Sequence, residues 1–402
     1  MFRITIFYVL MLSLFLGVLG CAAQEKTQKK WYKGNLHAHS YWSDGDEFPE
    51  MIMDWYRENN YNFTVLSDHN TLNEGDKWIS ISEKEYLQKG FQNYLGKFGE
   101  SWVNYKIDSL DRIRVKLKTY QEYQSLFNEK DKFLVIPSEE LTMYFEKKPI
   151  HINATNIQQK IDPKKGADVA SIIQNNIDAI LDQRKELSVP IMPHLNHPNF
   201  GYGVSVEDLK KVRNLKFFEV YNGHPLVNNY GDATRLSVEA MWDVLNIDYL
   251  QNNKALLFGI AADDSHHYHQ FDKNYSNAGR GWVMVLAESL HAESIISAME
   301  KGAFYASTGV VLKKAEVNNK KLYIEIAAEE NVTYEIQFIG VKKNAQKAEI
   351  ISTTKGLKAE LAITDDYLFV RAKIISSRTN QNFFDETEYE KAWTQPLIPI
   401  VQ

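Results

Sequence analysis

Histidine and carboxylate residues recur along the chain in short motifs with the spacing of metal ligands. The segment Leu36-His37-Ala38-His39-Ser40 places two histidines two residues apart. Side chains two apart on a strand face the same side, so this pair can hold one ion together. Further candidate ligands are Asp44, Asp68, His69, Glu139, Glu140, His151, His194, His197, Asp263, Asp264 and His266. Each alone is more often a satisfied buried group or part of a turn, but the whole set predicts a metal site.

The elements that must position these residues follow an alternating pattern. Short apolar runs rich in Val, Ile and Phe predict strands at 31–37, 62–66, 132–136, 149–153, 190–193, 216–220, 255–260 and 281–286. Helix-like stretches lie between them at 48–59, 169–185, 206–212 and 236–251. Such alternation predicts an α/β fold with a parallel sheet, and this many repeats predicts a closed barrel. The candidate ligands then fall at the carboxyl ends of strands, where barrel enzymes build their sites.

Two regions depart from a simple barrel. Residues 71–130 are rich in Tyr, Lys and Glu and predict a helical insertion beside the barrel mouth. After Val310, short alternating or β-branched runs with turn residues between them predict a small antiparallel β domain over 311–402. The expected barrel domain therefore spans 31–310.

Composition narrows the possible partners. The chain has 402 residues, 44% of them hydrophobic, and a formal net charge of −6. Proteins that coat nucleic acids are usually strongly basic, so no stable nucleic-acid complex is expected. A small phosphorylated substrate stays open, because metal ions can supply positive charge locally.

The first 21 residues resemble an export signal. Arg3 precedes an apolar run over 4–18, which is shorter than the roughly 20 residues that a bilayer-spanning helix needs. Val18-Leu19-Gly20-Cys21 resembles a bacterial lipobox, and residues 22–30 form a polar tether. We expect a lipoprotein of the cell envelope, held to a membrane outside the cytoplasm through lipidated Cys21. The alternatives are a plain signal peptide and a transmembrane anchor.

Several motifs together resemble the polymerase and histidinol phosphatase (PHP) superfamily. They are His37-x-His39, Ser67-Asp68-His69-Asn70, the glutamate after Pro137-Ser138, His197-Pro198 and Asp264-x-His266, in the family order over 31–310. Stretches such as Glu219-Val220-Tyr221-Asn222-Gly223 and Gly279-Arg280-Gly281-Trp282 resemble secreted stand-alone members. The resemblance implies a distorted (β/α)7 barrel with three metal ions.

The resemblance also implies a ligand set. His37 and His39 would hold the first ion with Asp264 and Glu140, and Glu140 would bridge to a second ion held by His151 and His197. Asp44, His69 and His266 would hold the third. Catalysis would fall to Glu140, His197, Asp264 and His266. The positions Glu139, His194 and Asp263 remain competitors for Glu140, His197 and Asp264. Zn, Mn and Fe would all accept this mixture of ligands, which suits them better than Ca.

The activity implied is hydrolysis of phosphate esters by a hydroxide shared between metal ions. Arg280 is expected to make a bidentate phosphate contact, with a structural salt bridge as the alternative. His224 is a candidate pocket residue, and His267 and His269 are expected to face solvent. Two competing functions are hydrolysis of another bond in envelope or scavenged polymers, glycans included, and metal-bound recognition without catalysis.

Overall fold

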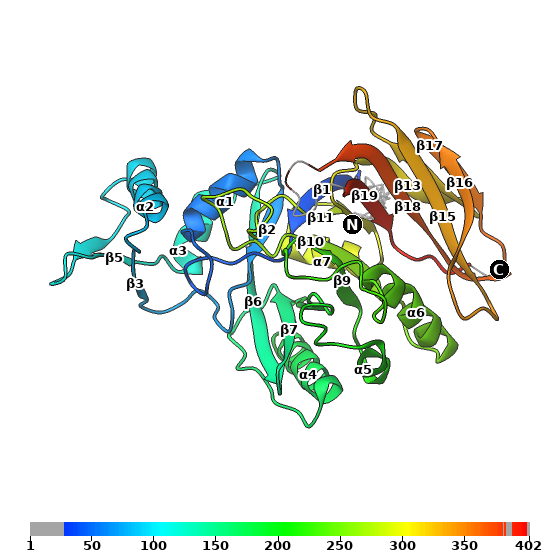
Figure 1. The fold of residues 1–402 in the computed structure, drawn as a ribbon, viewed down its shortest axis with the longest axis horizontal. Helices are drawn as coiled ribbons and strands as arrows, with labels where there is room; N and C mark the ends of the chain where they lie inside the picture. Colours follow the sequence, from blue (N-terminus) through cyan, green and yellow to red (C-terminus); the bar gives the residue numbers. More distant parts are fainter. Residues whose placement is uncertain (1–27, 381, 383–387, 400–402) are drawn as a thin grey trace, which may run out of the picture.

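The computed structural model describes residues 28–380, 382 and 388–399 (Figure 1). The expected export signal, Cys21 and most of the expected tether lie outside these residues. None of the helices within the described ranges is long and apolar enough to cross a membrane.

One large sheet of 13 strands organises the molecule. Its order is β10-β9-β8-β7-β6-β2-β1-β11-β12-β19-β18-β15-β16. The strands that carry the histidine and carboxylate motifs, or directly precede them, are β1 (Lys30–Asn35), β2 (Phe63–Leu66), β6 (Leu134–Phe145), β7 (Lys148–Thr155), β8 (Met192–Leu195), β9 (Phe217–Asn222) and β10 (Phe258–Ala262). The remaining strands are β11 (Trp282–Ala287), β12 (Phe304–Ser307), β15 (Tyr334–Lys342), β16 (Glu349–Lys355), β18 (Tyr367–Thr379) and β19 (Tyr389–Thr394). Each strand predicted within 31–310 overlaps one of these.

The sheet is mixed and open, so the prediction of a closed parallel barrel is not confirmed. Parallel pairing holds for β1 with β2, β2 with β6, β8 with β9 and β9 with β10. However, β7 returns from β6 as an antiparallel hairpin through a turn that holds Glu146 at φ 55°. Beyond the ladder, an isolated bridge between Ala38 and Ser265 joins the segments that follow β1 and β10. This bridge brings the candidate ligands of the two segments together.

Helices pack against the sheet as the alternation predicts. They are α1 (Pro49–Glu58), α4 (Val169–Leu187), α5 (Val206–Lys211), α6 (Val238–Gln251) and α7 (Ala292–Glu300). Helix α4 begins at Asp168, whose side chain accepts from Ser171 N in a capping box. Its apolar residues Ile173, Ile177 and Ile180 are fully buried in the core beneath β7 and β8. This packing fixes the strands whose ends approach the histidines.

The insertion at 71–130 contains strands as well as helices, so the prediction of a helical insertion is only partly right. Strands β3 (Trp78–Ser80), β5 (Ile113–Lys116) and β4 (Tyr105–Ile107) form an antiparallel sheet in the order β3-β5-β4. Helices α2 (Glu85–Phe98) and α3 (Tyr120–Phe127) accompany them. Phe91 and Tyr94 pack with Trp42 and Phe48 in one apolar cluster. The insertion therefore rests on the loop that carries Asp44, and it projects from one side of the molecule in Figure 1.

The C-terminal part contains a separate antiparallel sheet of β13 (Leu312–Asn318), β14 (Lys321–Ile326) and β17 (Lys358–Ala362). Its other strands extend the large sheet, because β19 pairs with β12. Arg371 of β18 fixes this part to α6: Nη2 lies 2.7 Å from Asp243 Oδ2 and 3.0 Å from Glu239 Oε1. The small antiparallel sheet was predicted, whereas its continuity with the main sheet was not.

We predict that Arg371→Met lowers the free energy of unfolding by about 3–5 kcal/mol, because it leaves Asp243 and Glu239 without their buried partner. The control is Lys321→Met, which removes the exposed pair with Glu360 and costs at most about 1 kcal/mol. Urea unfolding followed by fluorescence measures both. Equal effects of the two substitutions would contradict the role of Arg371.

Candidate metal centre

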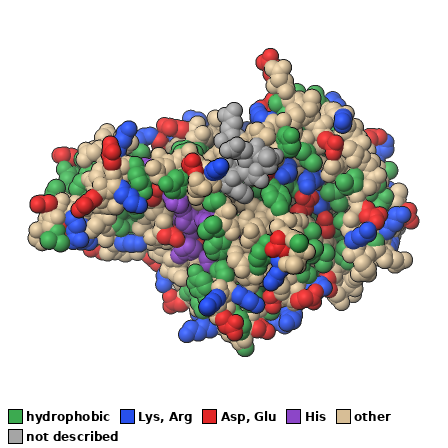
Figure 2. Space-filling model, viewed as in Figure 1, with side chains coloured by type: hydrophobic (Ala, Val, Ile, Leu, Met, Phe, Trp, Pro, Cys, Tyr) green, Lys and Arg blue, Asp and Glu red, His purple; other side chains and the backbone are tan. Residues whose placement is uncertain are grey.

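The predicted ligands meet in one cluster. His37 and His39 follow β1, His69 follows β2, Glu140 and His151 lie on β6 and β7, His197 follows β8, and Asp264 and His266 follow β10. The cluster combines several groups of three or four side chains whose ligand atoms lie within 4.8 Å of one another. Figure 2 shows histidine side chains gathered at the surface of one face, beside the insertion.

The innermost group surrounds His37 and His39. Their Nε2 atoms lie 3.1 Å apart, and each is 3.2 Å from Asp264 Oδ1. Glu140 completes the group, with Oε1 3.3 Å from His37 and Oε2 3.4 Å from His39. All four side chains are buried. Two imidazole nitrogens and two carboxylates that converge on one point form a donor set suited to a divalent cation.

A second group shares Glu140. This group consists of His69, Glu140 and His151, with His69 Nδ1 2.7 Å from Glu140 Oε2 and His151 Nδ1 3.0 Å from Oε1. His197 groups instead with His37 and Asp264, although its Nε2 lies 3.6 Å from Glu140 Oε1. His151 is buried, yet neither of its ring nitrogens has a hydrogen bond of acceptable geometry among the described residues. Buried polar atoms are normally satisfied, so these nitrogens fit a metal-binding role. Glu140 is therefore shared by two groups of candidate metal ligands.

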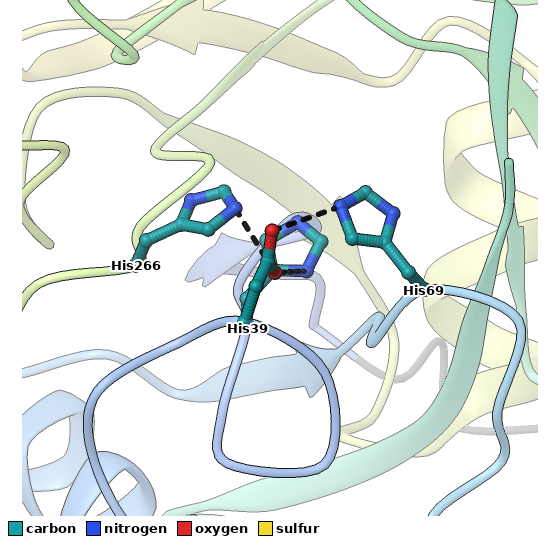
Figure 3. A group of neighbouring side chains, drawn as sticks. His39, His69 and His266 are labelled. Atoms are coloured by element: carbon teal, nitrogen blue, oxygen red, sulfur yellow. Dashed lines mark ion pairs between the residues drawn. The ribbon is translucent and has the colours of Figure 1, made fainter. Parts of the chain in front are cut away.

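The third group is centred on Asp44. Figure 3 shows the rings of His39, His69 and His266 around one point. The Asp44 carboxylate lies 3.8 Å from His39 Nδ1, 3.6 Å from His69 Nε2 and 3.4 Å from His266 Nε2. These four residues form one potential metal-binding group. Asp44 is the most exposed member of the ligand set, with 57% of its side chain accessible, so this group lies at the mouth of the cluster.

The carboxylates of the cluster need positive charge beside them. Burial, together with the neighbouring His266 and His69, lowers the pKa of His39 to about 3. Burial also acts to lower the pKa of His69, but the charges of Glu140 and Asp44 outweigh it and raise that pKa to about 11. The carboxylates thus require compensation at this point, which a proton or a divalent cation supplies.

The geometry separates two pairs of competing residues. Neighbouring residues of β6 face opposite sides, so Glu140 reaches the cluster while Glu139 accepts from Ile161 N at 3.0 Å. Burial is the main cause that raises the pKa of Glu139 to about 7. Asp263 accepts from Gly281 N at 2.8 Å and from Tyr56 Oη at 2.9 Å, away from the histidines. The structure thus places Glu140 and Asp264 in the cluster and their neighbours outside it.

Glu219, which was not predicted as a site residue, contacts the metal-ligand cluster on its buried side. Glu219 at the end of β9 is buried and lies 2.7 Å from His37 Nδ1. It also accepts from His197 N at 2.8 Å. With Nδ1 held by this carboxylate, His37 presents Nε2 to the cluster. His194 Nε2 lies 3.6 Å from Glu219, so His194 forms a group with His37 on this rear side. Its position at the end of a predicted strand, like that of the other candidates, could have identified Glu219 from the sequence.

Other predicted site residues have different surroundings. Arg280 is buried and donates to the backbone carbonyls of Gly223, Asp272 and Asn382 at 3.0, 3.0 and 2.6 Å. It therefore ties three segments together, and the phosphate contact stays a prediction. His267 and His269 are partly buried rather than in solvent: Nδ1 of the first accepts from Ser276 N, and Nε2 of the second lies 2.8 Å from Asp46 O.

His224 lies next to the cluster. Its ring centroid is 5.5 Å from that of His266, and the side chain is partly buried. Burial is the main cause that lowers its pKa to about 4, so the ring is uncharged near neutral pH. The expected place of His224 in a pocket stays a prediction.

Comparison with known proteins gives only distant structural matches. No family model matches the chain, and no curated protein is significantly similar to it. A two-domain Bacteroides vulgatus protein, described as containing a predicted PHP-like metal-dependent phosphoesterase, has 14% identity and a TM-score of 0.41 over 91% of this chain and 95% of its own. A candidate metal-dependent phosphoesterase from Bifidobacterium adolescentis has 12% identity and a TM-score of 0.30 over 59% of this chain and 88% of its own.

An amidohydrolase from Chromobacterium violaceum has 10% identity and a TM-score of 0.28 over 58% of this chain and 87% of its own. Likeness at these levels carries no conclusion about activity.

We predict that Glu219→Gln weakens metal binding about 10- to 100-fold, because the charged partner of His37 is lost. Glu139→Gln is the matched control: it changes a buried glutamate that lies outside the cluster. Competition with a chromophoric chelator measures the affinity of both variants for Zn and Mn. Equal affinities in the two variants would contradict the positioning role of Glu219.

Proposed function

We propose that the protein is a metal-dependent hydrolase of the PHP superfamily that cleaves phosphate esters at a centre of three divalent ions. The observation that carries the proposal is Glu140, a buried carboxylate shared by the group of His37 and His39 and by the group of His69 and His151. Asp44, His69 and His266 would hold the outermost ion, next to the solvent-accessible side of the cluster. The order of the motifs along the chain supports the same family.

Divalent ions held in this way would lower the pKa of a bound water and neutralise charge on a phosphoryl group. The chain's own part is to hold the ligands in fixed positions. Glu219 orients His37, and His39 N donates to Ser265 O at 2.8 Å. Asp68 accepts from Ser40 N at 2.8 Å and from Ser43 Oγ at 2.6 Å, which fixes the loop that carries Asp44. Such preorganisation supplies much of the rate in phosphoryl transfer.

We predict that the full chain loaded with Mn or Zn hydrolyses 4-nitrophenyl phosphate or bis(4-nitrophenyl) phosphate. His39→Ala should lower kcat/KM at least about 100-fold, because His39 belongs to two of the metal-binding groups. His291→Ala is the control, since His291 is exposed at the start of α7. The rate of nitrophenolate release is the measurement.

The ratio of monoester to diester turnover would narrow the substrate class. Absence of turnover in protein that carries its metal ions would contradict a general phosphoesterase. It would favour hydrolysis of another bond by the same centre.

We also propose that Cys21 carries a lipid that anchors the protein in the cell envelope. Support comes from the apolar run and the lipobox-like residues that precede Cys21, all outside the described part of the structure. Labelled palmitate should be incorporated by the full chain and not by Cys21→Ala. Equal labelling of both would contradict the anchor.

A further inference from the structure

Phe200 lies three residues after His197 and borders the cluster. Its ring centroid is 5.1 Å from that of His197, 5.7 Å from that of His224 and 6.4 Å from that of His151. The side chain is only partly buried. Phe200 therefore presents an apolar face next to two of the proposed metal ligands.

The loop that carries Phe200 is held on two sides. Asn199 Nδ2 donates to Asn228 O at 3.0 Å and to Leu236 O at 2.9 Å, which joins the loop to the segment after β9. On the other side, Gly203 packs so closely on β7 that an added Cβ would lie 2.4 Å from Pro149 O. The backbone of the loop that carries Phe200 is thus anchored before any ligand arrives.

A second aromatic ring, that of Tyr144, lies next to His151. Tyr144, near the end of β6, has its ring centroid 6.2 Å from that of His151 and is 58% exposed. Large exposed aromatic side chains beside a site are a common means of binding flat ligands. Tyr144 and Phe200 therefore both lie next to His151. Phe200 also lies next to His224, whose ring in turn neighbours that of His266.

We propose that Phe200 and Tyr144 form a subsite for a flat ring on the leaving group of the substrate. The inference rests on the proposed phosphoesterase function and deepens it: the substrate class is a phosphate ester of an aryl, arylmethyl or nucleoside alcohol. The metal ions that the cluster would hold match the charged phosphoryl group, whereas the two rings match an uncharged planar group.

Three esters with primary alcohol leaving groups test the subsite: benzyl, cyclohexylmethyl and methyl phosphate. Benzyl and cyclohexylmethyl groups have similar size and differ in flatness. For the full metal-loaded chain we expect kcat/KM to be about tenfold higher for benzyl than for cyclohexylmethyl phosphate, from aromatic stacking. Replacing both rings, by Phe200→Leu with Tyr144→Leu, should bring this ratio close to one.

The ratio separates binding of the ring from damage to the metal centre. Both esters use the same metal ions, so loss of a metal would lower both rates and leave the ratio unchanged. Phe271→Leu is the control, because Phe271 is an exposed ring that packs against Trp55 rather than the cluster. It should keep the wild-type ratio. A wild-type ratio near one, or an unchanged ratio in the double variant, would overturn the subsite.

Failure of the proposed phosphoesterase function can be distinguished from failure of the ring subsite. If neither the nitrophenyl esters nor the three esters are hydrolysed, the phosphoesterase proposal falls. Calorimetric binding of benzylphosphonate against cyclohexylmethylphosphonate then tests the rings without turnover. A preference for the flat phosphonate that disappears in the double variant supports the subsite, and equal affinities overturn it.

Discussion

The buried negative charge of Glu140 and Asp264 is the constraint on which the rest of the site depends. Both carboxylates lie among histidine rings, and an uncompensated buried charge costs several kcal/mol. The compensation must come from within the cluster, because the ion pairs of these two side chains in the described part of the chain are all made with histidines. Divalent cations meet this requirement and also satisfy the ring nitrogens of His151.

The surrounding structure holds Asp264 in a backbone conformation that its residue type rarely adopts. Asp264 has φ 51°, in the left-handed region that few residues other than glycine adopt. Its N–H donates to His37 O at 3.0 Å, and this contact joins the segment after β10 to the segment after β1. Neighbouring Asp263 caps the turn at Arg280 and Gly281 through their N–H groups. The hydrogen bonds of Asp264 and of neighbouring Asp263 thus hold the backbone in this strained conformation.

The sequence allowed much of this to be predicted, for identifiable reasons. His37 and His39 are two residues apart, which on an extended segment can only mean a shared side. Glu140 and Glu139 could not be separated in this way, because the local pattern does not say which face of β6 meets the cluster. Strand positions were predictable from apolar runs, whereas the reversal between β6 and β7 depends on a turn at Glu146. The contacts of Arg280 could not be predicted, because its partners Gly223 and Asn382 are distant in sequence.

The proposed function depends on binding of metal ions by the histidine–carboxylate cluster, with Glu140 shared between them. The most direct measurement is a crystal structure of the Mn-loaded protein with data collected at the Mn absorption edge. We predict anomalous density between His37, His39, Glu140 and Asp264, with further density beside His151 and beside Asp44. Anomalous density that lies elsewhere, or a cluster without density in protein that retains its Mn, would contradict the account.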